Sequence, residues 1–196
     1  MIVVISPESE QINEHYLIEE LFANGLDYFH IRKYHFSDDE MRQYIDLIPP
    51  QLRGQLVLHS HFHLAREFNI NRFHINEKHR VSQQIIYFPE KFHYSTSVHK
   101  IQDYNHLSNF WEYAFFSPVF PSISKENYGV ENAVLQDIKH KKDSSILLLG
   151  LGGIHHKNYQ SLREQGADGG ALLGSIWQTP QPLSNFLKCK KIDLLY

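Results

Sequence analysis

Residues 146–154 read ILLLGLGGI, and residues 166–176 read GADGGALLGSI. Each stretch is an apolar run of strand length that ends in glycine, and a segment of helical character follows each one. Glycine at the end of a strand permits a positive φ and lets backbone N–H groups approach a ligand closely. Paired turns of this kind follow the last two strands of a (β/α)₈ barrel and bind phosphate there. The two stretches therefore predict a barrel that binds a phosphorylated small molecule.

The rest of the chain repeats the alternation of apolar strands and amphipathic helices. We expect strands near residues 2–5, 28–32, 55–59, 72–76, 92–98, 113–117, 146–150 and 169–173. We expect helices near residues 10–24, 38–48, 61–68, 100–108, 131–141, 156–165 and 182–190. Eight strands in βα alternation predict one α/β domain over residues 1–196, a compact (β/α)₈ TIM barrel. An open doubly wound sheet with fewer strands is the alternative.

Local signals support part of this pattern. Ser37 and Glu40 form a capping-box pair at the start of the second helix. Residues 77–91 show no clear periodicity, so they are either a long βα loop or a degenerate helix.

Composition excludes several classes of protein. The chain has 196 residues and a formal net charge of −3, which gives no broad basic field for nucleic acid. Cys189 is the only cysteine, so an internal disulfide is excluded and a reducing compartment is indicated. The N-terminus reads as a first strand rather than a signal peptide, and no apolar stretch reaches membrane-spanning length. We expect a cytoplasmic protein with no membrane or nucleic-acid partner.

In a parallel barrel, functional side chains gather at the C-terminal ends of the strands, which we call the rim. His30 and Arg32 end the second strand on one face, because side chains alternate along a strand. A guanidinium at this place suits a phosphate or diphosphate, and a neighbouring carboxylate is the structural alternative. The other polar residues expected at the rim are Lys33, His59, Ser60, His61, His74, Asn76, Glu77, Ser95, Ser97, His99, Ser117, Ser124 and Lys125.

The chain contains 14 histidines, so a metal site has to be considered. His59 and His61 form an H-x-H pair at a strand end, as in barrel amidohydrolases, and His74 and His99 could complete it. Such hydrolases also need an aspartate base after a late strand, whereas Asp168 precedes the last strand. We therefore expect no dedicated metal site. His59 remains a candidate rim residue, and His63 is expected to lie in the following helix.

Taken in order, these segments resemble the superfamily of thiamine phosphate synthases and TenI-like thiazole tautomerases. The match spans nearly the whole chain, and its specificity lies in the ordered set rather than in any single motif. Residues 29–32 (FHIR) are similar to QLREK or HIRE, 58–65 (LHSHFHLA) to NDRxDLA, and 73–77 (FHINE) to VHLGQ. Residues 117–125 (SPVFPSISK) are similar to GPVFPTxTK, 151–154 (LGGI) to GGI, and 166–169 (GADG) to GADG.

The resemblance implies a (β/α)₈ barrel, a homodimer, and two phosphorylated substrates. Synthases of this superfamily join a thiazole phosphate to a pyrimidine methyl diphosphate and release diphosphate with the help of Mg²⁺. Arg32, Ser97 and Lys125 match the diphosphate-side positions of the family, and we expect Arg32, Lys125 and the rim residue His59 to be catalytic. Gly153 matches the thiazole-phosphate glycine, and Gly174 and Ser175 occupy the second phosphate turn. The full set of expected substrate-binding residues is His30, Lys33, Ser97, Ser124, Gly152, Gly153, Gly174 and Ser175.

The chain also departs from the superfamily pattern. The two magnesium aspartates fall at Ser60 and near Lys78 or His79, so a magnesium site would be weakened. Tautomerases likewise lack these carboxylates and carry HIR, but their catalytic histidine falls at Pro118. The loop at residues 117–125 favours a synthase, with a tautomerase and a non-catalytic thiazole-phosphate-binding relative as alternatives.

Overall fold

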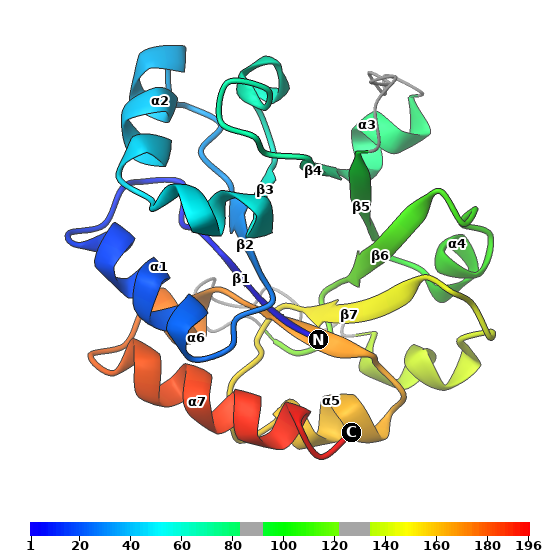
Figure 1. Ribbon diagram of the computed structural model, residues 1–196. Helices are drawn as coiled ribbons and strands as arrows, with labels where there is room; N and C mark the ends of the chain where they lie inside the picture. Colours follow the sequence, from blue (N-terminus) through cyan, green and yellow to red (C-terminus); the bar gives the residue numbers. More distant parts are fainter. Residues whose placement is uncertain (83–91, 122–133) are drawn as a thin grey trace.

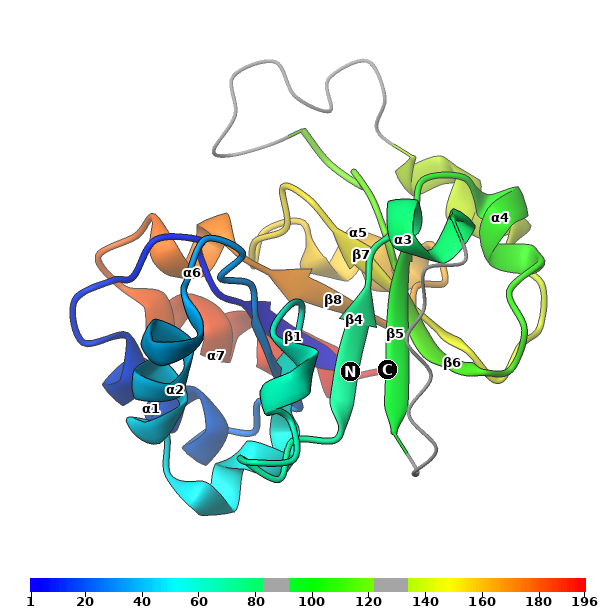
Figure 2. The same cartoon turned by 90° about the horizontal axis from the view of Figure 1, so that it is seen from above.

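The computed structural model describes residues 1–82, 92–121 and 134–196, and in these residues it forms one closed barrel of parallel strands. Each strand pairs with the next along the chain, and the eighth pairs with the first. The predicted (β/α)₈ barrel is thus confirmed, and closure excludes the open sheet (Figures 1 and 2). The strands are β1 (Ile2–Ile5), β2 (Tyr28–Ile31), β3 (Leu56–Leu58), β4 (Arg72–Ile75), β5 (His93–Val98), β6 (Trp111–Phe116), β7 (Leu147–Leu151) and β8 (Gly169–Leu172).

Helices lie outside the ring of strands (Figure 1). The α-helices are α1 (Glu14–Ala23), α2 (Asp38–Asp46), α3 (Glu77–Val81), α4 (Ile101–Asn105), α5 (Tyr159–Glu164), α6 (Gly174–Trp177) and α7 (Pro182–Asp193). The 3₁₀ helices are η1 (Pro50–Gln55), η2 (Phe62–Leu64) and η3 (Leu135–His140). The termini meet, because the amino group of Met1 lies 3.2 Å from a carboxylate oxygen of Asp193 in α7.

Several predicted helices are shorter than expected. Residues 61–68 give only η2, because His61 and Asn69 adopt positive φ values of 54° and 55° and so bound the segment. The predicted capping box is present in α2, where Ser37 Oγ accepts from the Glu40 N–H at 3.3 Å and Glu40 Oε2 accepts from the Ser37 N–H at 2.7 Å. Within residues 77–91 the described part forms α3, and residues 83–91 lie outside the description.

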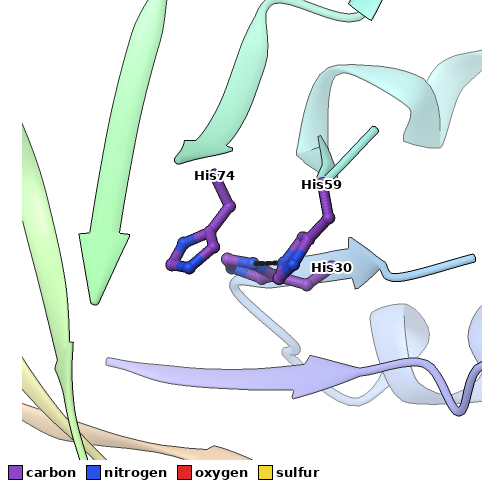
Figure 3. A group of neighbouring side chains, drawn as sticks. All are labelled: His30, His59 and His74. Atoms are coloured by element: carbon purple, nitrogen blue, oxygen red, sulfur yellow. Dashed lines mark hydrogen bonds between the residues drawn. The ribbon is translucent and has the colours of Figure 1, made fainter. Parts of the chain in front are cut away.

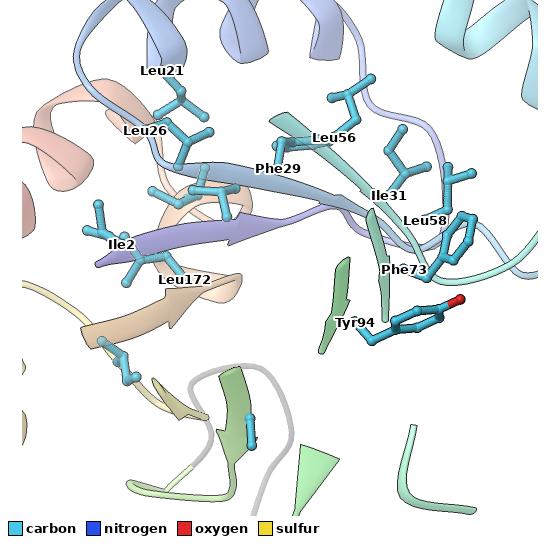
Figure 4. Packing of buried hydrophobic residues seen from close by; sticks show 14 of the residues in the cluster. Ile2, Leu21, Leu26, Phe29, Ile31, Leu56, Leu58, Phe73, Tyr94 and Leu172 are labelled. Atoms are coloured by element: carbon cyan, nitrogen blue, oxygen red, sulfur yellow. The ribbon is translucent and has the colours of Figure 1, made fainter. Parts of the chain in front are cut away.

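Two apolar cores flank the barrel wall. The larger core packs the outer strand faces against the helices, and Figure 4 shows Leu21 of α1 directed at the same layer as Phe29 and Ile31 of β2. The smaller core fills part of the barrel interior with Val3, Ile5, Tyr113, Phe115, Leu149 and Ala171. Those residues belong to β1, β6, β7 and β8, whereas the interior positions of β2, β4 and β5 include buried His30, His74 and Ser95. The interior is therefore divided into an apolar half and a polar half.

Across the described ranges, no helix is both long and apolar enough to cross a membrane.

Cys189 lies in α7 and its side chain is fully buried. Burial, together with the nearby Asp193 carboxylate, raises the pKa of the thiol to about 12. A buried thiol that stays protonated is a poor nucleophile. We expect the folded protein to resist alkylation by iodoacetamide at mildly alkaline pH, and the guanidinium-unfolded protein to take up one label per chain by mass spectrometry. Rapid labelling of the folded chain would contradict this packing of α7.

Candidate functional site at the C-terminal rim

Arg32 occupies the rim at the end of β2. Its backbone N–H donates to Ser6 Oγ at 2.8 Å, which ties the end of β2 to the end of β1. The side chain is 32% exposed, and its Nη2 atom lies 4.0 Å from a carboxylate oxygen of Glu8. Within the described ranges, Arg32 Nε is buried and has no hydrogen-bond partner. A guanidinium with a loose ion pair and an unused donor can bind an anionic ligand.

Lys33 does not join Arg32 at the rim. Its side chain is fully buried, and Nζ lies 2.9 Å from Glu14 Oε2 and 3.0 Å from the Ser9 carbonyl oxygen. Burial lowers the pKa of Lys33, and the hydrogen bond to Glu14 opposes that shift. Alternation explains the difference, because consecutive residues point to opposite faces of a strand. These contacts give Lys33 a structural role, in which it holds Glu14 and the segment around Ser9 against the end of β2.

Three histidines from neighbouring strands converge inside the barrel (Figure 3). His30 lies on β2, His59 follows β3, and His74 lies on β4. His30 Nδ1 and His59 Nε2 are 2.9 Å apart, and the rings of His59 and His74 stack with centroids 4.4 Å apart. Each side chain is less than one-tenth exposed. We call these three residues the histidine cluster.

Burial keeps the histidine cluster uncharged near neutral pH. Desolvation lowers the pKa of His30 and His59 well below the usual value and lowers the pKa of His74 to about 3. Hydroxyl groups surround the rings and satisfy their nitrogens. The contacts are His30 Nε2 with the Tyr113 hydroxyl at 2.8 Å, His59 Nδ1 with the Tyr34 hydroxyl at 3.5 Å, and His74 Nδ1 and Nε2 with Ser95 Oγ and Ser97 Oγ at 2.9 Å each.

The grouping of His59 with His61 and His99, weighed from the sequence, is not found. His61 Nε2 bonds the Phe36 carbonyl oxygen at 2.8 Å, and His63 Nε2 bonds Asp38 at 2.9 Å. His99 lies on the surface, where its Nδ1 donates a hydrogen bond to the Ser117 carbonyl oxygen at 2.8 Å. His30 takes the third place instead. The sequence holds a sign of this pairing of His30 with His74. The same tripeptide, FHI, occurs at 29–31 in β2 and at 73–75 in β4, and in both strands it places the histidine on the interior face.

The glycine turn after β7 has the backbone that the sequence predicts. Gly152 and Gly153 have φ values of 102° and 63°. A Cβ on Gly153 would lie 2.1 Å from the Pro121 carbonyl oxygen, so no larger residue fits without a shift of the chain. Asn158 Nδ2 donates to the Gly153 carbonyl oxygen at 2.9 Å and holds the turn against the start of α5.

The second turn joins β8 to α6. Gly174 is the first residue of α6, and Asn185 Nδ2 donates to the Ser175 carbonyl oxygen at 3.0 Å. Ser175 Oγ is buried and has no hydrogen-bond partner in the part of the chain that is described. Buried hydroxyls normally have a partner, so this one has an unused donor. Ser124 and Lys125, the remaining predicted site residues, lie outside the described residues.

An open cavity of about 610 Å³ lies at the opposite, N-terminal end of the barrel. Its charged lining residues are engaged with other groups: Asp27 Oδ2 accepts from the Ile2 N–H at 2.7 Å, and Arg72 Nη1 bonds Glu112 at 2.5 Å. Active sites of (β/α)₈ barrels lie at the C-terminal end of the strands. We therefore place the candidate site at the rim.

The closed ring of eight parallel strands with external helices defines a (β/α)₈ barrel protein. The chain belongs to the thiamine monophosphate synthase family, whose TMP-TENI model matches residues 1–176. No curated protein matches the sequence.

Solved structures agree with this family. A thiamine phosphate pyrophosphorylase from Bacteroides thetaiotaomicron is 27% identical, with a TM-score of 0.77 over 99% of this chain and 98% of that one. One from Pyrococcus furiosus is 15% identical, with a TM-score of 0.78 over 99% and 95%. A geranylgeranylglyceryl phosphate synthase from Thermoplasma acidophilum, solved with sn-glycerol-1-phosphate, shares the fold at 12% identity and a TM-score of 0.66 over 100% and 93%. The chain is thus a barrel of the thiamine monophosphate synthase family.

Proposed function

We propose that the chain is a thiamine phosphate synthase that joins a thiazole phosphate to a pyrimidine methyl diphosphate. Departure of diphosphate leaves a pyrimidine methyl cation, and the thiazole ring nitrogen attacks it to form the new C–N bond. The observation that carries the proposal is the family match over residues 1–176. We also expect a homodimer in solution, which light scattering on the purified chain would measure.

Arg32 is the residue we propose for the diphosphate. Its buried Nε has no partner among the described residues, and its contact with Glu8 at 4.0 Å is loose. A planar guanidinium can bind two phosphate oxygens and neutralise charge on the leaving group. Lys125 and Ser124 are proposed to add charge and a hydroxyl from the following loop, as the resemblance implies.

The two glycine turns are proposed to hold the thiazole phosphate. Gly153 keeps a positive φ of 63° where a Cβ would collide with Pro121, and Ser175 Oγ is a buried hydroxyl without a partner in the described ranges. Backbone N–H groups of such turns, with a free hydroxyl, match phosphate oxygens. The two substrates would then approach from opposite sides of one rim, which sets the thiazole nitrogen against the pyrimidine methyl carbon.

The magnesium ion implied by the family does not fit the residues present. Mg²⁺ prefers carboxylate and other hard oxygen ligands. The two aspartate positions of the family carry Ser60 and Lys78 or His79, and Ser60 Oγ already bonds His61 Nδ1 at 2.8 Å. We therefore propose that any magnesium dependence is weaker than in enzymes with both aspartates, and we assign no step to the ion.

Replacement of Arg32 tests the diphosphate side. We expect Arg32→Ala to lower kcat/KM for the pyrimidine diphosphate about 100-fold, because one charge-assisted contact to the leaving group is lost. Arg32→Lys should recover part of the loss, since lysine keeps the charge but not the planar fork. Arg42→Ala, which removes a surface arginine of α2 that pairs with Glu67, is the matched control and should change little. Equal effects of the Arg32 and Arg42 variants would refute the assignment.

Turnover decides between the proposed activities. The purified chain should release diphosphate and form thiamine phosphate when both substrates are supplied. No product over a wide range of magnesium concentrations would reject the synthase.

A thiazole tautomerase is the second candidate, and the histidine cluster is the observation that favours it. His30 and His59 are imidazoles whose nitrogens lie 2.9 Å apart, and a histidine pair can carry a proton between two positions of a ring. The position of the pair favours this activity, whereas burial lowers the pKa of both rings and weakens them as bases. Interconversion of the two thiazole carboxylate phosphate tautomers, without diphosphate release, would select this activity. Binding of the thiazole phosphate with neither reaction would select a non-catalytic relative.

A further inference from the structure

The histidine cluster has the composition and spacing of a transition-metal site. One nitrogen from each of His30, His59 and His74 can be chosen so that all three atoms lie within 4.8 Å of one another. A tetrahedral zinc ion with Zn–N bonds of about 2.0–2.1 Å separates its nitrogen ligands by roughly 3.3 Å. The His30–His59 pair is already closer than that, at 2.9 Å. His30 and His59 would move slightly apart around an ion, and the His74 ring, which now stacks on His59, would have to turn one nitrogen toward it.

The surroundings of the rings resemble the outer contacts of metal-binding histidines. Such histidines normally direct the nitrogen away from the metal at a hydrogen-bonding partner, which orients the ring and fixes the tautomer. His30 Nε2 has the Tyr113 hydroxyl at 2.8 Å and His59 Nδ1 has the Tyr34 hydroxyl at 3.5 Å. These contacts leave His30 Nδ1 and His59 Nε2 facing each other. His74 has a serine hydroxyl at each nitrogen and would give up one of them to the ion.

We propose that His30, His59 and His74 bind one divalent transition-metal ion of the zinc class inside the barrel. Three imidazoles without a carboxylate suit zinc, cobalt or nickel and do not suit magnesium. The ion would replace the hydrogen bond between His30 and His59. This site differs from the family's magnesium positions at Ser60 and His79, and it does not use His61 or His99.

The charges around the histidine cluster indicate which kind of fourth ligand the ion would need. The three neutral rings leave both positive charges of the ion uncompensated, and Arg72 and Arg32 already act on His30 and His59 as nearby positive charges. A buried dication in that field needs an anion as its fourth ligand, either hydroxide or an anionic group of a substrate. His59, 8% exposed, is the most exposed of the three. We infer that the fourth position faces the rim beside His59.

Metal content of the full-length chain tests the proposal without any thiazole or pyrimidine substrate, so its outcome is separate from that of the synthase assay. The chain is stripped with a chelator, loaded with Zn²⁺, desalted and analysed by mass spectrometry of the metal. We expect about one zinc per wild-type chain and a loss of about tenfold or more in His59→Asn and His74→Asn. His63→Ala and His99→Ala remove surface histidines and should keep the zinc.

Because cluster variants could fail to fold, the wild-type chain provides a second measurement. Loading with Co²⁺ should give the intense visible absorption of a four-coordinate ion, and Zn²⁺ should raise Tm by binding only the folded chain. Wild-type protein that retains no zinc and shows only the spectrum of hydrated Co²⁺ would overturn the proposal. Zinc that is lost equally in His63→Ala would overturn it as well.

Discussion

Replacing Glu14 with alanine is expected to lower the free energy of unfolding by about 3–5 kcal/mol, because it leaves a buried charge without its partner. Glu14 and Lys33 are 2% and 0% exposed, and their charged atoms lie 2.9 Å apart. The Tyr44 hydroxyl also donates to Glu14 Oε1 at 2.6 Å, so the substitution leaves a second buried group unsatisfied. Urea unfolding followed by circular dichroism measures the change.

Two further variants separate the ion pair from simple loss of volume. Glu20→Ala changes an exposed residue of the same helix α1 and should shift the free energy of unfolding by less than about 0.5 kcal/mol. The double variant Glu14→Leu with Lys33→Met removes both charges and should recover most of the loss. A double variant as unstable as Glu14→Ala would show that packing, and not the unpaired lysine, determines the effect.

Gly153→Ala is expected to weaken binding of the thiazole phosphate by tenfold or more, about 1.4 kcal/mol. Alanine at φ 63° is strained, and its Cβ would lie 2.1 Å from the Pro121 carbonyl oxygen and 2.8 Å from Phe120 Cβ. Relief of this overlap requires the turn after β7 to move away from residues 120 and 121. The N–H groups proposed to face the phosphate would then lose their alignment. Calorimetric titration with the thiazole phosphate measures the change.

Gly54→Ala is the matched control for that substitution. Gly54 lies in η1, and an added Cβ would have no atom within 4 Å. This variant should bind the thiazole phosphate as the unchanged chain does. Unaltered affinity in Gly153→Ala would argue against a phosphate at the turn after β7.

The sequence was sufficient for the barrel because each strand carries a strong local signal. β7 and β8 are largely buried apolar strands that glycines follow (Gly152 and Gly153 after β7, Gly174 after β8), and β2 and β4 each carry a buried histidine. Helix lengths were less predictable. The expected helix at 61–68 shortens to η2, since residues such as His61 adopt positive φ for reasons of tertiary packing that periodicity does not encode.

The candidate site was predictable only in part. Gly153 and Arg32 are found at the expected end of the barrel. Both follow a strand in the sequence, and residues that follow a strand of a parallel barrel lie at its C-terminal end. The side of the barrel wall on which a side chain lies is harder to predict. Lys33 follows Arg32 by one residue, yet it points away from the rim and pairs with Glu14 of α1. The histidine cluster depends on the stagger between β2, β3 and β4, which pairs His30 with Val57 and Leu58 with Phe73. Such register is a property of the closed sheet and not of one strand.

A crystal structure of the chain with the thiazole phosphate bound tests the central claim most directly. We expect the phosphate to lie against the backbone N–H groups of Gly153 and Gly174, with Ser175 Oγ donating to it and the thiazole ring directed toward Arg32. A phosphate bound elsewhere, for example at the N-terminal cavity beside Arg72, or no bound ligand at saturating concentration, would contradict it.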